Sequence, residues 1–195
     1  GPPPRQDGPP PRKNDKAPPP GDRPRRKEDR PQPREQSEKR RESNLPQLSI
    51  SSSSVDDGGM LSIDCTCDGK RQSPAVEWKD VPEGTKAFAV SLWHSAPDQE
   101  KSYWLVYNIP ADTTSMAQNA KPDGTVGLND RRRAEFDPMC SKGPGIKTYH
   151  ITVFALSQNV NLRPDQASRS DLLKAIEGKV LAEGTLDFQY ERTGN

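Results

Sequence analysis

Apolar and polar side chains alternate along several stretches of the chain from Leu48 onward, which is the pattern of a β-strand with one buried face. A further run, Trp104–Ile109, is apolar and aromatic almost throughout and predicts a central strand. Sequences that favour turns, such as Pro82-Glu83-Gly84, separate the strands. The alternating stretches are residues 48–51, 61–64, 88–93, 149–156 and 186–190.

One segment near the C-terminal end has the spacing of a helix instead. Ser168 and Asp171 resemble a capping box, and Gly184 is expected to end the helix. The order of many strands, one late helix and a last strand predicts a mainly β fold, a sandwich with a peripheral helix, and not a wound α/β sheet. The apolar stripe of this helix is Leu172, Leu173, Ile176, Val180 and Leu181.

Residues 1–44 have a different composition from the rest. They hold 12 of the 21 prolines, 13 Lys or Arg against 8 Asp or Glu, and Ala17 as their single apolar residue. Too little apolar surface is present to offset the entropy of ordering the backbone, so we expect a disordered, extended tail before a folded domain over 45–195. Three roles fit this tail: a solvated tether, binding to an acidic polymer or surface, and recognition by a proline-binding module.

Composition excludes several classes of protein. No apolar run approaches the roughly 20 residues of a membrane helix, and the net charge of +1 gives no overall electrostatic field to attract nucleic acid.

The chain begins Gly1-Pro2 and shows no signal peptide. A Pro/Arg-rich leader before a folded domain favours an exported protein, periplasmic or extracellular, whose signal was removed.

Candidate chemistry is sparse, and the sequence predicts no enzyme and no cofactor. Of the two histidines, only His94 is a candidate base, and no Gly-x-Ser-x-Gly elbow accompanies it. The three cysteines allow a disulfide from Cys140 to Cys65 or Cys67, with one thiol left over, whereas a metal site is the minor alternative. The turn 143–145 and the cluster 131–133 are predicted to be solvated loops, with anion binding as the less favoured interpretation of each.

Several motifs, in order, resemble the phosphatidylethanolamine-binding protein family, which includes the Raf kinase inhibitor proteins and bacterial relatives. The segment Ser73–Lys86 is similar to SPxLxWxxVPxGTKS, and Tyr103–Thr113 to HWxVxNLPADT. Tyr149–Leu156 resembles the strand motif HRYxFTVYAL from its tyrosine on, and Leu172–Arg192 the bacterial C-terminal pattern. The blocks cover most of residues 60–192. The resemblance implies an antiparallel β-sandwich with a C-terminal helix and a small anion pocket.

The chain departs from the family at the pocket. Both aspartates of the family's DPDAP motif are replaced, by Trp93 and Ser95, and the pocket histidines by Tyr103 and Lys147. Lys147 would favour anions, whereas Trp93 is large enough to fill the pocket, so an altered or filled pocket and a retained one both remain open. The resemblance also implies a disulfide between Cys67 and Cys140 at the pocket mouth. The ligand-binding candidates are Trp93, Ser95, Pro97, Tyr103, Trp104, Cys140, Lys147, Tyr149 and Lys179.

What the resemblance implies for function is non-enzymatic binding. The candidate ligands are small anions, phosphate or a phospholipid headgroup, and a candidate activity is inhibition of a protein kinase or a protease. The alternative is an exported interaction protein without a working pocket, which acts on a protein partner through its surface or its basic Pro-rich tail. The position of Trp93 discriminates between the two.

Overall fold

The computed structural model describes residues 1–4, 8, 45–142 and 144–192. The chain divides into two units, Gly1–Arg40 and Arg41–Asn195. The tail predicted over residues 1–44 lies almost wholly outside the described residues, so the structure described below is that of the second unit.

Two antiparallel sheets form a β-sandwich. The large sheet has the order β6 (Thr125–Val126), β4 (Glu100–Pro110), β3 (Ala87–Ser95), β7 (Ile146–Leu156) and β8 (Val180–Glu191). The small sheet has the order β1 (Ser49–Ser51), β2 (Val76–Lys79) and β5 (Ser115–Met116). The mainly β sandwich that the sequence pattern and the resemblance predict is therefore confirmed.

Most of the predicted strands are present, but the one predicted at residues 61–64 is not. Ile63–Cys65 form a turn of 3₁₀ helix, η1, in its place. Ser62 accepts a hydrogen bond from the N–H of Asp64, and the Thr66 hydroxyl donates to the carbonyl of Ile63. These bonds between side chains and nearby backbone compete with strand pairing, which explains why the alternation misleads here.

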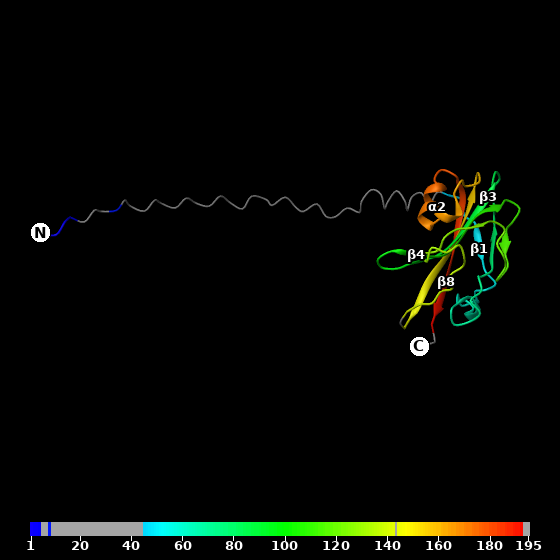
Figure 1. Cartoon of the computed structure of the whole chain (residues 1–195), viewed down its shortest axis with the longest axis horizontal. Helices are drawn as coiled ribbons and strands as arrows, with labels where there is room; N and C mark the ends of the chain where they lie inside the picture. Colours follow the sequence, from blue (N-terminus) through cyan, green and yellow to red (C-terminus); the bar gives the residue numbers. More distant parts are fainter. Residues whose placement is uncertain (5–7, 9–44, 143, 193–195) are drawn as a thin grey trace. The chain divides into compact units, whose positions relative to one another are not determined.

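The large sheet separates two apolar layers, and helix α2 (Arg169–Ala175) lies beside this sheet (Figure 1). One layer lies between the sheets and contains Trp78 of β2, Phe88 of β3 and Tyr149 of β7. The other lies between the large sheet and α2, where Leu172 and Ile176 pack against the opposite faces of the same strands. The two faces of β3 and β7 are thus both covered, and adjacent residues on these strands belong to different layers.

Helix α2 follows the short 3₁₀ turn η2 (Pro164–Gln166) and begins with the predicted capping box of Ser168 and Asp171. It ends nine residues before Gly184, because Gly178 adopts a φ of +77° and turns the chain back into β8. Val180 therefore pairs with β7 and does not extend the helix. Gly184 lies within β8, where a Cβ would come within 2.1 Å of the Leu48 carbonyl oxygen, so it permits a close approach of two backbones.

Candidate functional site

A β-bulge in β4 brings two neighbouring aromatic residues to the same face of the large sheet. Leu92 pairs with Trp104 and Trp93 with Ser102, which leaves Tyr103 without a partner in the ladder. Successive residues of a regular strand point to opposite faces, but a bulge can aim two in succession at one face. Tyr103 consequently packs against the layer between the sheets, as Trp104 does.

Tyr149 lies at the centre of an aromatic group in that layer. Its side chain is 1% exposed, with the ring of Tyr103 edge-on at 5.6 Å, His94 at 5.1 Å and Phe188 stacked at 5.8 Å. Burial raises the pKa of both phenols, that of Tyr103 to about 12. Both hydroxyls therefore keep their protons at neutral pH, and the two phenols also interact with each other.

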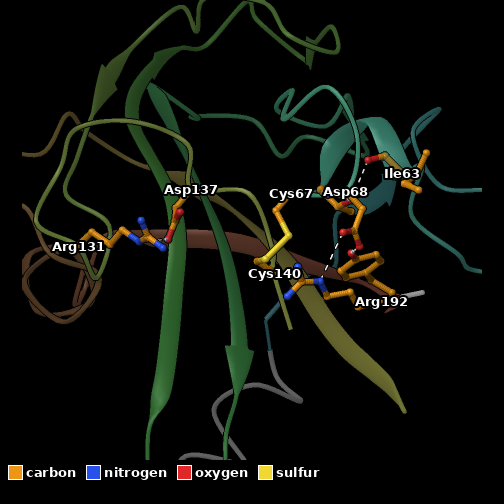
Figure 2. The surroundings of a disulfide bond; sticks show 9 residues. Ile63, Cys67, Asp68, Arg131, Asp137, Cys140 and Arg192 are labelled. Carbon is orange, nitrogen blue, oxygen red and sulfur yellow. Dashed lines mark hydrogen bonds and ion pairs between the residues drawn. A yellow bond between two sulfur atoms is a disulfide. The ribbon is translucent and has the colours of Figure 1, made fainter. Parts of the chain in front are cut away.

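A disulfide joins Cys67 to Cys140, with Cα atoms 5.3 Å apart, the pairing that the family resemblance implies (Figure 2). It fastens the loop before β7 to the segment that follows η1, and the Cys67 N–H also donates to the Met139 carbonyl at 3.1 Å. Cys65 is buried and unpaired, and burial raises the pKa of its thiol. The covalent link fixes the position of the residues that come directly after Cys140.

Asp68, next to the disulfide, holds the end of β8. Its carboxylate accepts a hydrogen bond from the Tyr190 hydroxyl and lies 3.4 Å from Nε of Arg192 (Figure 2). The disulfide and this carboxylate together anchor the segment after η1 to both the loop before β7 and the last strand.

Ser141 directly follows the disulfide and lies close to the aromatic group. Its hydroxyl is near enough to Tyr149 to lower that residue's pKa, against the larger effect of burial. The Oγ atom is buried, yet it makes no well-formed hydrogen bond within the part of the chain that the structure describes. A buried hydroxyl without a partner costs about 1–3 kcal/mol, so a ligand or water that satisfied it would be stabilised here.

Lys147 adds a positive charge on the same side. It lies two residues before Tyr149 on β7, so the two residues share a face, and it is opposite Tyr190 of β8. Its side chain is half-buried. Among the described residues, no acidic group forms a salt bridge with it. We call His94, Tyr103, Ser141, Lys147 and Tyr149 the tyrosine site.

A loop with a carboxylate borders the site beside Tyr103. The N–H of Asp137 donates to the Tyr103 carbonyl at 2.9 Å, and its carboxylate lies 3.4 Å from Nε of Arg131 (Figure 2). Burial raises the pKa of Asp137, and the nearby Arg131 partly opposes this. The basic cluster 131–133 is a turn, as predicted, and the Asn129 side chain accepts hydrogen bonds from the N–H groups of Arg131 and Arg133.

Trp93 does not belong to the tyrosine site, contrary to its prediction as a pocket residue. It pairs with His150 in the ladder and therefore lies on the α2 face of the large sheet. Its Nε1 donates to Oγ1 of Thr152 at 3.0 Å, and the guanidinium of Arg169 lies 4.4 Å from the centre of its ring. Trp93 thus cannot fill a pocket beside Tyr149. We call Trp93, His150, Thr152 and Arg169 the tryptophan cluster.

Lys179 also lies elsewhere. Its ammonium donates to the carbonyl of Ala175 at 2.8 Å and so satisfies the C-terminal end of α2. The strand β8 begins after it opposite Leu156, seven residues along β7 from Tyr149, a separation of roughly 23 Å. Lys179 occupies the position of a histidine in the family's C-terminal motif. In the structure it lies at the opposite end of the β7–β8 pair from Tyr149, because the helix ends early.

The remaining predicted residues border the site or lie in the core. Ser95 and Pro97 are exposed at the turn between β3 and β4. Trp104 is 3% exposed and packs against Phe136 at 5.8 Å, so it is a core residue next to the site. The sulfur of Cys140 is consumed in the disulfide. The turn 143–145 includes Gly143, which lies outside the described residues.

Sequence reasoning missed two members of the site. The sequence marks His94 only as a candidate base, and it gives no prediction for Ser141. His94 could have been found from the alternation of the strand, because His94 and its neighbour Trp93 must lie on opposite faces of β3. Ser141 could have been found from its position beside Cys140, once a disulfide there was inferred.

The two histidines have different partners. Nδ1 of His94 lies 2.8 Å from the carbonyl oxygen of Thr148, and Nδ1 of His150 lies 2.6 Å from Oδ1 of Asp187. Within the described ranges, neither ring has a hydroxyl or thiol as its hydrogen-bond partner, and no group of three or more His, Cys, Asp or Glu side chains could hold a metal ion. No helix in the described part of the chain is both long and apolar enough to span a bilayer.

The fold and this site define a class of protein: an antiparallel β-sandwich with hydrogen-bond donors and a lysine gathered at one end of its large sheet. Residues 51–191 match the family described as phosphatidylethanolamine-binding protein. The chain therefore belongs to the phosphatidylethanolamine-binding protein family.

Relatives and solved structures agree with this assignment. The chain is 34% identical to a UPF0098 protein of Aquifex aeolicus over 74% of this chain and 89% of the relative. It is 32% identical to a UPF0098 protein of Methanothermobacter thermautotrophicus over 74% of this chain and 99% of the relative. The crystal structure of Escherichia coli YbcL, described as a member of the mammalian PEBP family, superposes with a TM-score of 0.68 at 28% identity, over 75% of this chain and 99% of that one.

A structure of a phosphatidylethanolamine-binding protein homologue from Chlamydia trachomatis superposes with a TM-score of 0.70 at 22% identity, over 75% of this chain and 98% of that one. At this identity the similarity concerns the fold alone.

Proposed function

We propose that this chain is a non-catalytic binding protein whose tyrosine site takes a small anion, a phosphate or a phosphomonoester such as a phospholipid headgroup. The observation that carries the proposal is the buried hydroxyl of Ser141, which lies beside Tyr149 without a well-formed hydrogen bond among the described residues. A phosphate oxygen accepts hydrogen bonds and would satisfy this donor.

The charges near the site favour an anion over a cation. Lys147 has no salt-bridge partner in the described part of the chain, whereas the carboxylate of Asp137 is already paired with Arg131. The two phenols remain neutral because burial raises their pKa values, and so they do not repel an anion. The position of Trp93 on the other face supports an open site over a filled one.

An exported location, in the periplasm or outside the cell, is part of the proposal. The disulfide between Cys67 and Cys140 supports it, because disulfides persist in oxidising compartments and are rare in the cytosol. Inhibition of a kinase or a protease would be a consequence of binding and is to be assayed after a ligand is established.

The test is an NMR titration of the full chain with inorganic phosphate and with O-phosphoethanolamine. We expect saturable shifts at Tyr103, Ser141 and Tyr149. The Lys147→Gln variant should bind about tenfold more weakly, since a charge-assisted hydrogen bond contributes roughly 1.5–3 kcal/mol. Lys179→Gln is the matched control and should bind as the wild type does, because Lys179 caps α2.

The two ligands distinguish the sources of the phosphate group. Equal affinities would indicate a site for phosphate itself, and tighter binding of O-phosphoethanolamine a site for a headgroup. If neither ligand gives saturable shifts at this site at tens of millimolar, the proposal is wrong. The alternative function, a protein interaction through the surface or the tail, would then take its place.

A further inference from the structure

The imidazole of His94 is positioned at the tyrosine site in a single hydrogen-bonding arrangement. The ring lies 5.1 Å from the ring of Tyr149, and its Nδ1 is 2.8 Å from the carbonyl oxygen of Thr148. A carbonyl oxygen can only accept, so Nδ1 must carry a hydrogen and donate it. The neutral form of His94 is therefore the tautomer with its proton on Nδ1.

This arrangement determines what the second nitrogen can do. In the neutral ring Nε2 has a lone pair and accepts hydrogen bonds, whereas in the protonated ring it carries a hydrogen and donates. Among the described residues Nε2 has no hydrogen-bond partner. Protonation of His94 thus changes one polar atom of the site from an acceptor, which repels an anion, to a charged donor, which attracts it.

The groups that face His94 are mostly cationic or neutral. Lys101 is its direct partner on β4, and Lys147 lies on the same face of β7. Their ammonium groups repel a positive charge on the imidazole, and a bound anion would offset this repulsion. Two carboxylates act on the neighbouring Tyr103: that of Asp137, which is paired with Arg131, and that of Asp130, which accepts a hydrogen bond from the N–H of Ser102. The titratable or charged groups around His94 and its neighbours Tyr103 and Tyr149 are Lys101 of β4, Lys147 of β7, Tyr190 of β8, and Asp130 and Asp137 of the segment between β6 and β7.

We propose that His94 is a titratable contact of the tyrosine site, which binds a phosphate-type anion more tightly when the imidazole is protonated. The inference rests on the proposed function and adds its regulation by pH. Histidine is the side chain that ordinarily changes charge between pH 5 and 8. His94 contributes to binding and to its dependence on pH, and no bond is made or broken.

The chain supplies its own control, because it contains two histidines and the structure places them on opposite faces. His150 pairs with Trp93, and its Nδ1 is 2.6 Å from the carboxylate of Asp187. The nitrogen signals of both rings can be followed in one spectrum of the full chain, and each serves as the reference for the other.

The first measurement is a pH titration of both rings by long-range ¹H–¹⁵N correlation, with and without saturating inorganic phosphate. We expect phosphate to move the titration midpoint of His94 upward by about one pH unit, which by linkage equals about tenfold tighter binding to the protonated form. The midpoint of His150 should not move. The neutral form of His94 should show the pattern of a proton on Nδ1.

The second measurement is the affinity for phosphate at pH 5.5 and pH 8 in the wild type, H94Q and H150Q. Phosphate changes its own charge over this pH range in every measurement. The difference in pH dependence of affinity between the wild type and H94Q therefore isolates the contribution of His94. H94Q should lose most of the tenfold gain at low pH, and H150Q should follow the wild type.

The outcomes separate the two proposals. One outcome is that phosphate binds at the tyrosine site while the titration midpoint of His94 moves by less than about 0.2 pH unit, which by linkage is a change in affinity of less than roughly 1.6-fold. In that case the inference about His94 is wrong and the proposed function stands. A neutral ring with its proton on Nε2 would also overturn the inference. If neither phosphate nor O-phosphoethanolamine binds at either pH, the proposed function itself is wrong. The wild-type measurement decides the matter even where H94Q does not fold.

Discussion

Two aromatic clusters lie back to back on the large sheet and differ in how their polar groups are used. In the tryptophan cluster, Nε1 of Trp93 donates to Thr152, and Arg169 donates to Ser91 and forms an ion pair with Glu100. In the tyrosine site, Ser141 has no well-formed hydrogen bond and Lys147 no salt-bridge partner within the described residues. The Trp93 and Arg169 donors of the tryptophan cluster have partners within the protein, whereas the buried hydroxyl of Ser141 in the tyrosine site has none among the described residues.

The difference gives a physical criterion for separating structure from recognition. A polar network whose members are all satisfied stabilises and orients the elements that it joins, here α2 and the end of β3. A buried donor without a partner raises the free energy of the unliganded protein, so it calls for an explanation, such as a ligand or water that satisfies it. By this criterion we expect the tryptophan cluster to stabilise the fold, and the criterion supports our proposal that the tyrosine site binds a ligand.

The largest effect is expected from the covalent link at the tyrosine site, which the tryptophan cluster lacks. The double variant C67A/C140A should lower the free energy of unfolding by up to about 4 kcal/mol, since the disulfide closes a loop over a sequence separation of 73 residues. Urea denaturation measures this change. Reduction of the wild type should give a similar loss, whereas the double variant should not respond to reductant.

The same variant tests whether the effect is local. Amide hydrogen exchange should become faster in the loop around Ser141 and remain slow in β3 and β7 beside Trp93, because the ladders of the large sheet do not involve the disulfide. Equal loss of protection on both faces would contradict the separation of the two regions.

A smaller effect is expected from one substitution on each face, with opposite consequences. Trp93→Ala removes the ring between Arg169 and His150 and should cost about 2–3 kcal/mol of unfolding free energy. Its affinity for phosphate should stay within twofold of the wild type, a change of about 0.4 kcal/mol. Tyr149→Phe keeps the buried ring and should cost less than about 1 kcal/mol, yet weaken phosphate binding several-fold.

Calorimetry for binding and urea denaturation for stability, on both variants, check this crossed pattern. Trp93→Phe is the control for volume, since it keeps an aromatic ring under Arg169 and loses only the hydrogen bond to Thr152. A Trp93→Ala variant that folds normally but no longer binds phosphate would show that the two faces are coupled.

The sequence predicted the elements of the fold better than the face of the sheet on which individual residues lie. Hydrophobic alternation and the family motifs correctly identified the long strands, and the chemistry of Ser168 and Asp171 identified the start of α2. The pairing of Cys67 with Cys140 followed from the resemblance. These features depend on local patterns that a sequence displays directly.

The incorrect predictions concern the face of the sheet on which a side chain lies, because a shift of one residue along a strand moves a side chain to the other face. Trp93 was assigned to the site by its place in a motif, but the alternation of β3 puts it on the α2 face and brings His94 to Tyr149. Tyr103 lies at the site only because a bulge interrupts β4. Lys179 lies away from it because Gly178 ends the helix early. Bulges and left-handed glycines are set by tertiary pairing, which the sequence pattern alone does not display.

The smallest effect concerns the phenols, which the tyrosine site contains and the tryptophan cluster does not. Burial raises the pKa of Tyr103 to about 12 in the folded chain, whereas an unfolded tyrosine titrates near 10. The folded state therefore holds this proton more tightly. The stability that results is fully present below about pH 10 and is lost as the pH rises from about 10 to about 12.

Urea denaturation of the wild type and Tyr103→Phe at pH 9 and pH 11 measures this contribution. The wild type should lose on the order of 1 kcal/mol more than the variant between the two values, after allowance for solvent screening of a group that is only partly buried. Trp93→Phe, which changes the other face, should lose as much as the wild type. Equal losses in the wild type and Tyr103→Phe would mean that the phenol is as accessible in the folded chain as in the unfolded one. The hydroxyl would then be hydrated in the folded chain, and this would argue against Tyr103 as one of the buried groups that the proposed anion site requires.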